Sequence, residues 1–313
     1  MNGTRHQYAV YGACLDSAMP FPELRPANSA APRWTFDTTP ALAPMHDARE
    51  LGADRIYGDV HARLHSHSGG HRIQVDDTGS FDLSADRRRI VWEERAESWP
   101  DFVRAHLMGR VLATALYLDG LLPLHASAVE THAGVIGFLA PKGFGKSTLA
   151  LALAAAGARL VTDDTLPVEP GGAPHAWPGV HSLRVHDDAI AAVGLARPEL
   201  ETREGKRLVT DLGSDRLLMR RAPLAAVYLL DPVLPGTASV TREALSPMLA
   251  AISLVGHVKI GRMLGPAAAG AMLERAALIT HGVPTFRLRA PRDLERLPDT
   301  ARAVLAWHGG AAA

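Results

Sequence analysis

The residues whose types and spacing most directly suggest chemistry form a short loop between an apolar run and a helical pattern. Residues 140–147 read Ala-Pro-Lys-Gly-Phe-Gly-Lys-Ser, and they follow the apolar run 135–139. A loop of this composition can turn its backbone N–H groups toward phosphate oxygens, while the positive end of the following helix dipole points at the same charge. The segment differs from the pattern G-x-x-x-x-G-K-[ST] only by Ala140 in the first position. The sequence therefore predicts a phosphate-binding loop for ATP and Mg²⁺.

The residues of this loop have separate expected roles. Lys146 would reach the β- and γ-phosphates, and the Ser147 hydroxyl would ligate Mg²⁺. The two glycines permit the backbone angles that bring the chain close to a phosphate. The predicted nucleotide contacts are Lys142, Gly143, Phe144, Gly145, Lys146, Ser147 and Thr148.

Two consecutive carboxylates, Asp163 and Asp164, follow the short predicted strand 159–162. If this strand is the parallel neighbour of the strand at 135–139, both carboxylates lie at the carboxyl edge of the sheet, beside the phosphate loop. One carboxylate could hold Mg²⁺, and the other could accept the proton of an attacking hydroxyl. The alternative interpretation of an Asp-Asp pair at a strand end is a turn or a helix cap.

The elements that must position these residues suggest two regions in a chain of 313 residues, 47% of them apolar. Residues 1–99 carry short apolar or alternating runs separated by Pro, Gly, Asp and Ser, which predicts a strand-rich N-terminal region. Residues 100–313 would form the nucleotide-binding kinase domain. That region opens with a helical pattern from Pro100 to Gly120 and continues with an apolar strand at 224–230 and helical patterns at 245–254 and 267–279.

Charge and cysteine content restrict the expected partners and location. Lys and Arg number 33, and Asp and Glu also number 33, so the balance indicates neither nucleic acid nor an anionic membrane as a partner. The single cysteine, Cys14, cannot form an internal disulfide, and the polar start has no apolar signal region, which favours a cytoplasmic protein. The apolar stretch 102–124 is interrupted by charged residues, which favours a buried helix over a membrane span.

Three blocks of the sequence, residues 124–129, 137–147 and 157–164, together resemble the catalytic core of HPr kinase/phosphorylase, whose loop and acidic pair are similar to those of the phosphoenolpyruvate carboxykinases. The resemblance implies an α/β fold with a P-loop core of this type. It further implies His125 in the active site, Asp163 as the catalytic base, and Asp164 with Ser147 near the metal.

Taken with the segments 8–12 and 20–24, the chain looks more like the HPr-kinase-related proteins of lasso-peptide pathways. That resemblance implies an ATP-dependent serine kinase for the C-terminal serine of a ribosomal precursor peptide. The resemblance to the regulator kinase, together with the apolar carboxy-terminal helices, predicts a homo-oligomer. Thr148 stands where the regulator kinase has a glutamate, and its Glu-Ile-Arg-Gly-Leu-Gly signature is absent. Two alternatives stay open: a kinase for an HPr-type carrier protein or a small molecule, and a non-catalytic nucleotide-binding regulator.

Two further groups of residues have the right chemistry but weaker sequence context. Phosphoryl transfer usually needs a cation beyond the loop lysine, and Lys206 and Arg207 lie in a polar segment, 201–211, that could close over the nucleotide. A solvated loop is the alternative interpretation of that segment. Four histidines, at 61, 65, 67 and 71, could approach a metal, although the Ser and Gly between them predict a mobile loop instead.

Overall fold

The computed structural model describes residues 4–29, 31–202, 205–233 and 239–310. The chain divides into two compact units: an N-terminal unit, Met1–Gly120 with Lys259–Met272, and a C-terminal unit, Leu121–Val258 with Leu273–Ala313. The boundary lies after Gly120 and not at residue 99, because the helix that opens at Pro100 belongs to the N-terminal unit. Its apolar residues are buried there, and the Tyr11 hydroxyl donates to the Met108 carbonyl at 2.9 Å.

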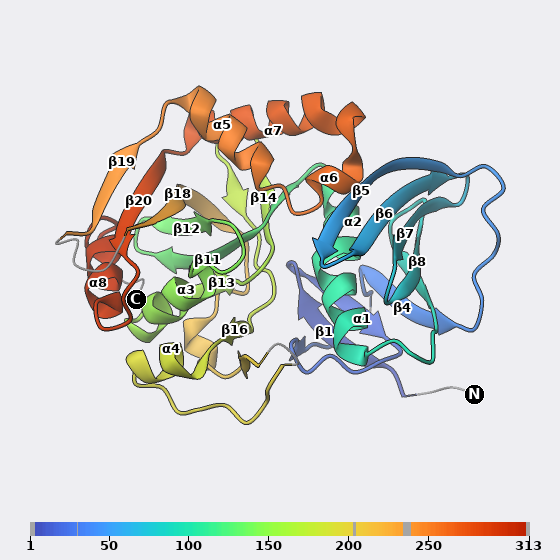
Figure 1. The fold of residues 1–313 in the computed structure, drawn as a ribbon, viewed down its shortest axis with the longest axis horizontal. Coiled ribbons are helices and arrows are strands. Elements are labelled where there is room, and N and C mark those ends of the chain that lie inside the picture. Colours follow the sequence, from blue (N-terminus) through green and yellow to red (C-terminus); the bar gives the residue numbers. More distant parts are fainter. Residues whose placement is uncertain (1–3, 30, 203–204, 234–238, 311–313) are drawn as a thin grey trace. The chain divides into compact units, whose positions relative to one another are not determined.

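The N-terminal unit is built on one nine-stranded sheet, which confirms the strand-rich prediction (Figure 1). Its strands lie in the order β3-β1-β2-β4-β9-β8-β7-β6-β5. Their bounds are β1 His6–Val10, β2 Ala13–Ser17, β3 Arg25–Pro26, β4 Trp34–Thr39, β5 Arg49–Tyr57, β6 Val60–His67, β7 Gly70–Val75, β8 Gly79–Ser84 and β9 Arg89–Glu93. The four histidines therefore lie in strands β6 and β7, and the prediction of a mobile loop is wrong.

The central strands of this sheet have an apolar and a polar face, because successive side chains of a strand point to opposite sides. Leu64, Ile73, Phe81 and Ile90 are fully buried on the apolar face. The helical segment beyond β9 consists of α1 Pro100–His106, a π-helical turn Leu107–Val111 and α2 Leu112–Leu118, and the turn packs against β8. A short helix, α6 Gly261–Leu264, packs on β5 in the same unit.

The C-terminal unit contains a second large sheet whose central strands lead into the predicted site. The main path is β10-β14-β15-β18-β12-β11-β13, and β20 pairs with both β18 and β19. The bounds are β10 Leu122–Leu124, β11 Ala126–Thr131, β12 Gly134–Leu139, β13 Arg159–Thr162, β14 Leu166–Glu169, β15 His175–Ala176, β18 Ala222–Val233, β19 Thr241–Ala244 and β20 Thr285–Pro291. Strands β12, β18 and β20 are parallel neighbours, so their carboxyl ends meet at one edge.

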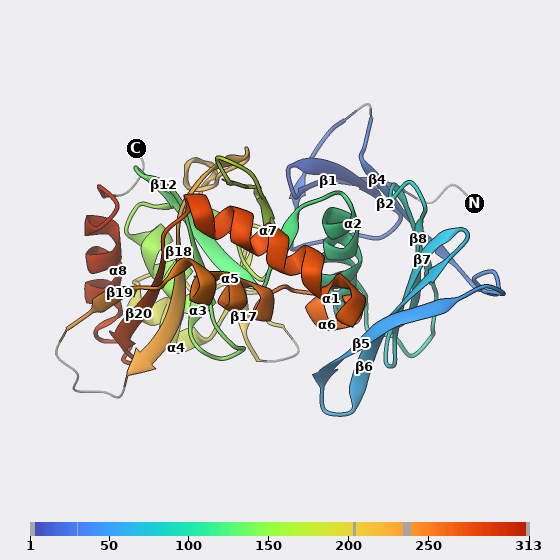
Figure 2. The ribbon, with the colours of Figure 1, turned by 90° about the horizontal axis from the view of Figure 1, so that it is seen from above.

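Helices cover both faces of this second sheet. Helices α3 Lys146–Ala155 and α8 Leu297–Ala306 pack together over one core, whereas α5 Pro247–Gly256 and α7 Ala269–Gly282 cover the opposite side of the strands (Figures 1 and 2). A separate two-stranded sheet joins β16 Leu183–Val185 to β17 Arg207–Val209, and α4 Asp187–Ala192 follows β16. The predicted helices at 245–254 and 267–279 are confirmed, each with its bounds shifted by about two residues.

The strands at 135–139 and 159–162 run in the same direction, as predicted, but they are not neighbours in the sheet. Strand β11 lies between β12 and β13 and pairs with each of them antiparallel, so β12 and β13 run the same way without touching. Their carboxyl ends still reach the same edge of the sheet. The intervening strand adds its own side chains to that edge.

Across the described ranges, no helix is both long and apolar enough to span a membrane.

Candidate active site

The glycine loop, residues 140–147, connects the end of β12 to the start of α3 in the predicted manner. Gly143 and Gly145 have φ of 87° and 89°, in the left-handed region, and a Cβ on either would meet no heavy atom within 4 Å. Glycine is thus needed there for the backbone angle and not for space. Ala140 has no positive φ, so its replacement of the first glycine costs no strain. Gly157, with φ of 104°, ends the helix in the expected position.

Lys146 is the first residue of α3, and its side chain is held under the loop. The residue is 7% exposed. Its ammonium donates to the Ala140 carbonyl at 2.8 Å and the Pro141 carbonyl at 3.2 Å, and it lies 3.2 Å from Nε2 of His125. A phosphate in the loop would compete with these carbonyls for the same ammonium. Of the other predicted nucleotide contacts, Lys142 and Phe144 are exposed and Thr148 is half-buried in the first turn of α3.

Asp163 follows β13 and is buried against two hydroxyl groups. It is 6% exposed, and its Oδ1 accepts a hydrogen bond from Ser147 Oγ at 2.9 Å and another from Ser127 Oγ. Ser127 lies on β11, the strand between β12 and β13. An ionised carboxylate is an acceptor only, so this arrangement suits two hydroxyl donors.

Asp164 has a different environment, although it is the next residue. Its φ is 75°, which makes it one of three non-glycine residues with positive φ in the described part of the chain. Its side chain is 45% exposed, and Oδ1 lies 3.4 Å from Nδ1 of His125. A strained backbone that persists in a folded protein is held by its surroundings and often marks a functional position.

The two acids have different partners in the structure. The resemblance implies that Asp164 and Ser147 lie near the metal; the Ser147 hydroxyl contacts Asp163, and Asp164 is beside His125. The metal and catalytic roles of these residues stay predictions. The hydroxyl and carboxylate oxygens fit the hard cation Mg²⁺, which keeps several waters and needs only one or two protein carboxylates beside substrate phosphates. Within the described residues, no cluster of three or more His, Cys, Asp or Glu side chains could hold a metal ion, and the strand histidines therefore form no such site.

The two predicted auxiliary cations, Lys206 and Arg207, lie at the start of β17, and each makes contacts within its own segment or with α4. Arg207, in β17, is ion-paired with Asp187 at 2.9 Å and with Glu201 at 2.8 Å, so two carboxylates already neutralise it. The backbone N–H of Lys206 donates to Thr202 Oγ1 at 3.3 Å. Residues 203 and 204 of the same segment lie outside the described ranges. A phosphate contact by Lys206 or Arg207 stays a prediction.

Two residues of this neighbourhood were missed by the sequence interpretation. Arg292 follows the end of β20, and its Nη2 donates to the Gly143 carbonyl at 3.3 Å. Its position after a parallel strand at the loop's edge of the sheet was the available signal. His257 caps the end of α5, and its backbone carbonyl accepts a hydrogen bond from the His125 backbone N–H at 2.7 Å. Burial lowers the pKa of its imidazole, and the nearby Lys146 charge adds to that effect.

Comparisons with known proteins add little to this geometry. No protein-family model and no curated protein matches the sequence. Among solved structures, the chain is similar to the HPr(Ser) kinase/phosphatase from Coxiella burnetii, at 14% identity over 60% of this chain and 99% of that chain, with a TM-score of 0.33. This likeness is too weak to argue from, and the function is inferred from the chain's own residues.

Proposed function

We propose that the chain is a phosphotransferase that moves the γ-phosphoryl group of ATP to a hydroxyl acceptor. The observation that carries the proposal is the combination of a glycine loop opening α3 with two carboxylates of different environment beside it. A buried carboxylate on the loop serine and an exposed one beside a histidine are the two acidic groups that phosphoryl transfer to a hydroxyl requires. A regulator that only binds nucleotide would need no exposed, strained Asp164 next to His125.

The geometry favours a division of labour opposite to the one implied by resemblance. Asp163 contacts the Ser147 hydroxyl and is closed to a large acceptor, so we assign it to the metal side. When bound between Ser147 and Asp163, Mg²⁺ would neutralise charge on the β- and γ-phosphates. Asp164 is open to solvent, so we assign it to the acceptor hydroxyl, whose proton it would accept, with His125 orienting the carboxylate.

Two cations would stabilise the charge of the transferring group. Lys146 leaves the loop carbonyls to contact the β- and γ-phosphates. Arg292 already touches the loop at Gly143 and would extend toward the γ-phosphate. We favour Arg292 over Arg207 for this role because Arg207 is neutralised by two acidic side chains.

For the acceptor we propose a ribosomal precursor peptide of the lasso type, phosphorylated on its C-terminal serine in the cytoplasm. The support is the sequence resemblance carried by residues 124–129, 137–147 and 157–164 together with the segments 8–12 and 20–24. An HPr-type carrier protein or a small molecule is the alternative acceptor. The protein should be incubated with labelled ATP, Mg²⁺ and either a candidate precursor, the same peptide with its last serine changed to alanine, HPr, or no acceptor. Label on the serine peptide alone supports the proposal, and label on HPr alone contradicts it.

Paired variants test the division of labour between the two acids. Asp164→Asn should lower kcat by roughly two orders of magnitude or more with little change in ATP affinity, since it removes the base. Asp163→Asn should instead weaken Mg²⁺-dependent ATP binding. If Asp163→Asn affects only kcat and Asp164→Asn only Mg²⁺ affinity, the assignment is reversed and the resemblance gave the correct roles.

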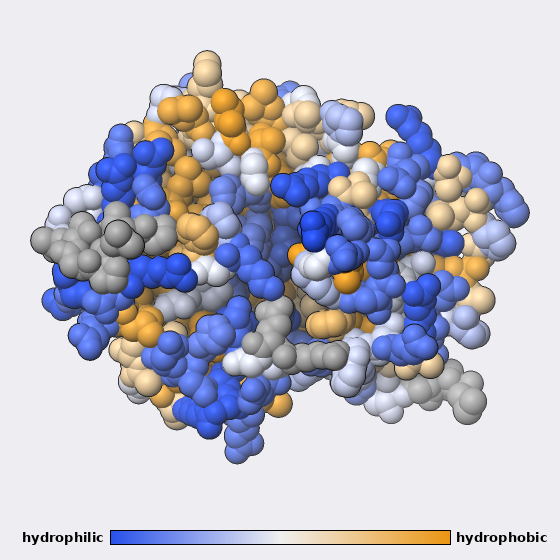
Figure 3. All heavy atoms as spheres, viewed as in Figure 1, coloured by the Kyte–Doolittle hydropathy of each residue, from blue (hydrophilic) through white to orange (hydrophobic). Residues whose placement is uncertain are grey.

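We also propose that the C-terminal unit forms a homo-oligomer through α5 and α7. Large apolar side chains are exposed on both helices: Met248, Leu249, Ile252, Leu273 and Leu278. Figure 3 shows orange surface where Figure 1 draws these two helices. Helix α5 contains no charged residue, which is unusual for a helix face in contact with water. Ile252→Lys should lower the molar mass measured by light scattering, whereas Met219→Lys, at an exposed position elsewhere, should not.

A further inference from the structure

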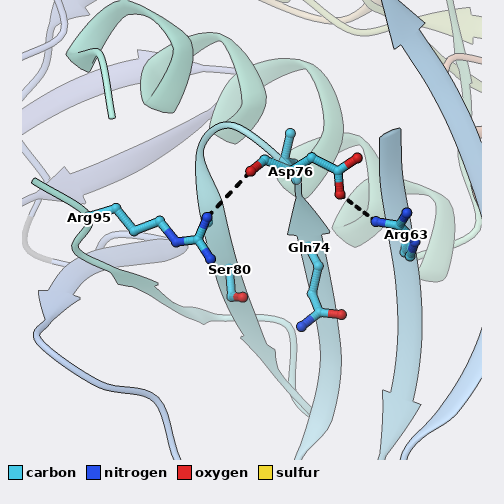
Figure 4. A pocket seen from close by; sticks show the side chains of 7 residues that line it. Arg63, Gln74, Asp76, Ser80 and Arg95 are labelled. Carbon is cyan, nitrogen blue, oxygen red and sulfur yellow. Dashed lines mark hydrogen bonds and ion pairs between the residues drawn. The ribbon is translucent and has the colours of Figure 1, made fainter. Parts of the chain in front are cut away.

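A small cavity opens on the polar face of the sheet in the N-terminal unit. Its volume is about 190 Å³, enough for a small polar group such as a carboxylate with its first neighbours. The lining residues are Arg63, Gln74, Val75, Asp76, Gly79, Ser80 and Arg95 (Figure 4). All of them belong to one compact unit.

Strand register places the polar side chains of this cavity in one row. Arg63 of β6 is the direct partner of Gln74 of β7, and Gln74 is the direct partner of Ser80 of β8. Directly paired residues of antiparallel strands project from the same face with their Cβ atoms about 5 Å apart. A guanidinium, an amide and a hydroxyl therefore lie side by side across three strands.

Two of these groups have unused hydrogen-bonding capacity. In the part of the chain that the structure describes, neither the Gln74 amide nor the Ser80 hydroxyl makes a side-chain hydrogen bond. Ser80 is only 7% exposed. Neither group is among the buried side-chain atoms that lack a partner, so both are open to solvent, and both side chains line the cavity, where a ligand can reach them.

Arg95 closes the cavity from the segment after β9. Its aliphatic stem lies over Gly79, where an added Cβ would come within 3.3 Å of the Arg95 Cδ atom. Its Nη1 donates to the Asp76 carbonyl at 3.3 Å, and Arg63 Nη1 donates to Asp76 Oδ1 at 2.5 Å. Figure 4 shows both guanidinium groups reaching toward Asp76 from opposite sides. Gly79, with φ of 101°, leaves the room that the Arg95 stem occupies.

We propose that this cavity is a binding site for a carboxylate group, carried by a small organic acid or by an acidic side chain of a peptide. The lining holds two guanidinium groups, Arg63 and Arg95, and one carboxylate, Asp76, so it carries one net positive charge. A monoanion balances that charge, and planar guanidinium groups match the two oxygens of a carboxylate. A phosphate dianion would place two negative charges on one group beside Asp76, whereas the second carboxylate of a diacid such as succinate can stay in solvent. Gln74 and Ser80 supply the additional donors.

The test follows the side-chain N–H resonances of arginine and glutamine in the full chain by NMR during titration. The probes are succinate, the peptide acetyl-Gly-Asp-Gly-Asp-Gly-amide, and inorganic phosphate. We expect the Arg95 and Gln74 signals to shift with at least one carboxylate probe, with a Kd in the millimolar range or below. Tighter binding of succinate identifies a free acid as the source, and tighter binding of the peptide identifies a protein segment.

Matched variants separate the proposed contacts from general surface charge. Arg95→Gln and Gln74→Met should each raise the Kd at least threefold, while Arg89→Gln, an exposed arginine of β9 outside the cavity, should leave it unchanged. A circular dichroism spectrum checks that each variant is folded. The proposal is overturned if neither carboxylate shifts these signals, if Arg89→Gln weakens binding as much as Arg95→Gln, or if phosphate binds more tightly than both carboxylates.

Discussion

The two candidate sites of this protein take their side chains from different parts of their strands. In the C-terminal unit, Asp163 and Arg292 each follow the last residue of a strand, and Lys146 opens the helix beyond one. In the N-terminal unit, Gln74 and Ser80 lie within strands. Residues that follow parallel strands come together because the strands end at the same edge of the sheet. Residues within strands come together only when the register of the strand pairing aligns them. The first kind of site leaves a local motif in the sequence, and the second leaves none.

Loss of the loop lysine gives the largest expected effect and tests whether the two sites are independent. Lys146→Ala should lower turnover about a thousandfold, because it removes the buried cation that would leave the loop carbonyls for the phosphates. ATP affinity by calorimetry and initial rates are the measurements. Lys142→Ala, at an exposed position of the same loop, should have a much smaller effect.

The same variant should leave succinate and peptide binding at the cavity lined by Arg63 and Arg95 unaltered. A parallel loss of carboxylate binding in Lys146→Ala would mean that the two sites are one functional system. Unchanged turnover in Lys146→Ala would remove the basis for the proposed function.

Acid should weaken the C-terminal unit through His308. Burial, with a contribution from the Arg242 charge, lowers the pKa of His308 from 6.5 to about 4, and the residue is 8% exposed with Nε2 2.6 Å from the Tyr228 hydroxyl. The unfolded chain therefore binds this proton more readily than the folded one. Stability is complete above about pH 6.5 and declines as the pH falls toward 4, by up to about 3 kcal/mol.

Urea unfolding at several pH values, followed by tryptophan fluorescence, measures this decline. His308→Gln should flatten the dependence between about pH 6.5 and 4, and His132→Gln, an exposed histidine, should not. Burial also lowers the pKa of His71 in the N-terminal sheet, which predicts acid sensitivity there too. An identical pH profile in wild type and His308→Gln would show that other groups control the acid response.

Arg292 tests whether strand-end position alone identifies a functional residue. Arg292→Gln should lower kcat roughly tenfold, or about 1.4 kcal/mol, because a cation near the transferring group is lost while the loop stays intact. The matched control is Arg289→Gln, three residues earlier within β20, where the side chain pairs with Asp231. Equal effects of the two variants in steady-state assays would exclude a specific role for Arg292.

Much of the C-terminal fold was predictable because local signals agreed. The apolar run 135–139, the glycines of the loop and Gly157 define a strand, a turn and a helix end, and each is found as predicted. A strand at about 128–129 and a turn at 131–134 were also predictable, but the place of β11 between β12 and β13 was not, because a strand's local pattern does not specify which strands flank it. Only the pairing of distant segments decides between them.

The directions of the side chains at the site could not be predicted from the sequence. The sequence places Asp163 and Asp164 together, but the left-handed φ of Asp164 turns the two carboxylates toward different partners, Ser147 and His125. Arg292 lies 149 residues from Gly143 of the loop in sequence, and only the parallel pairing of β12, β18 and β20 brings it there. The cavity row of Arg63, Gln74 and Ser80 likewise depends on register.

Two glycines with similar φ angles, one in each site, give the smallest expected effects and allow a direct comparison of the two sites. Gly143, with φ of 87°, has open space around it, whereas Gly79, with φ of 101°, lies under the Arg95 stem. Alanine at either position should cost about 1 kcal/mol of stability through backbone strain.

Gly143→Ala should weaken ATP binding several-fold and spare carboxylate binding, because it deforms only the loop. Gly79→Ala should do the reverse, because its Cβ displaces Arg95. Calorimetric titration of ATP and NMR titration of succinate on both variants measure the four affinities, and a loss of both ligands in either variant would contradict separate sites.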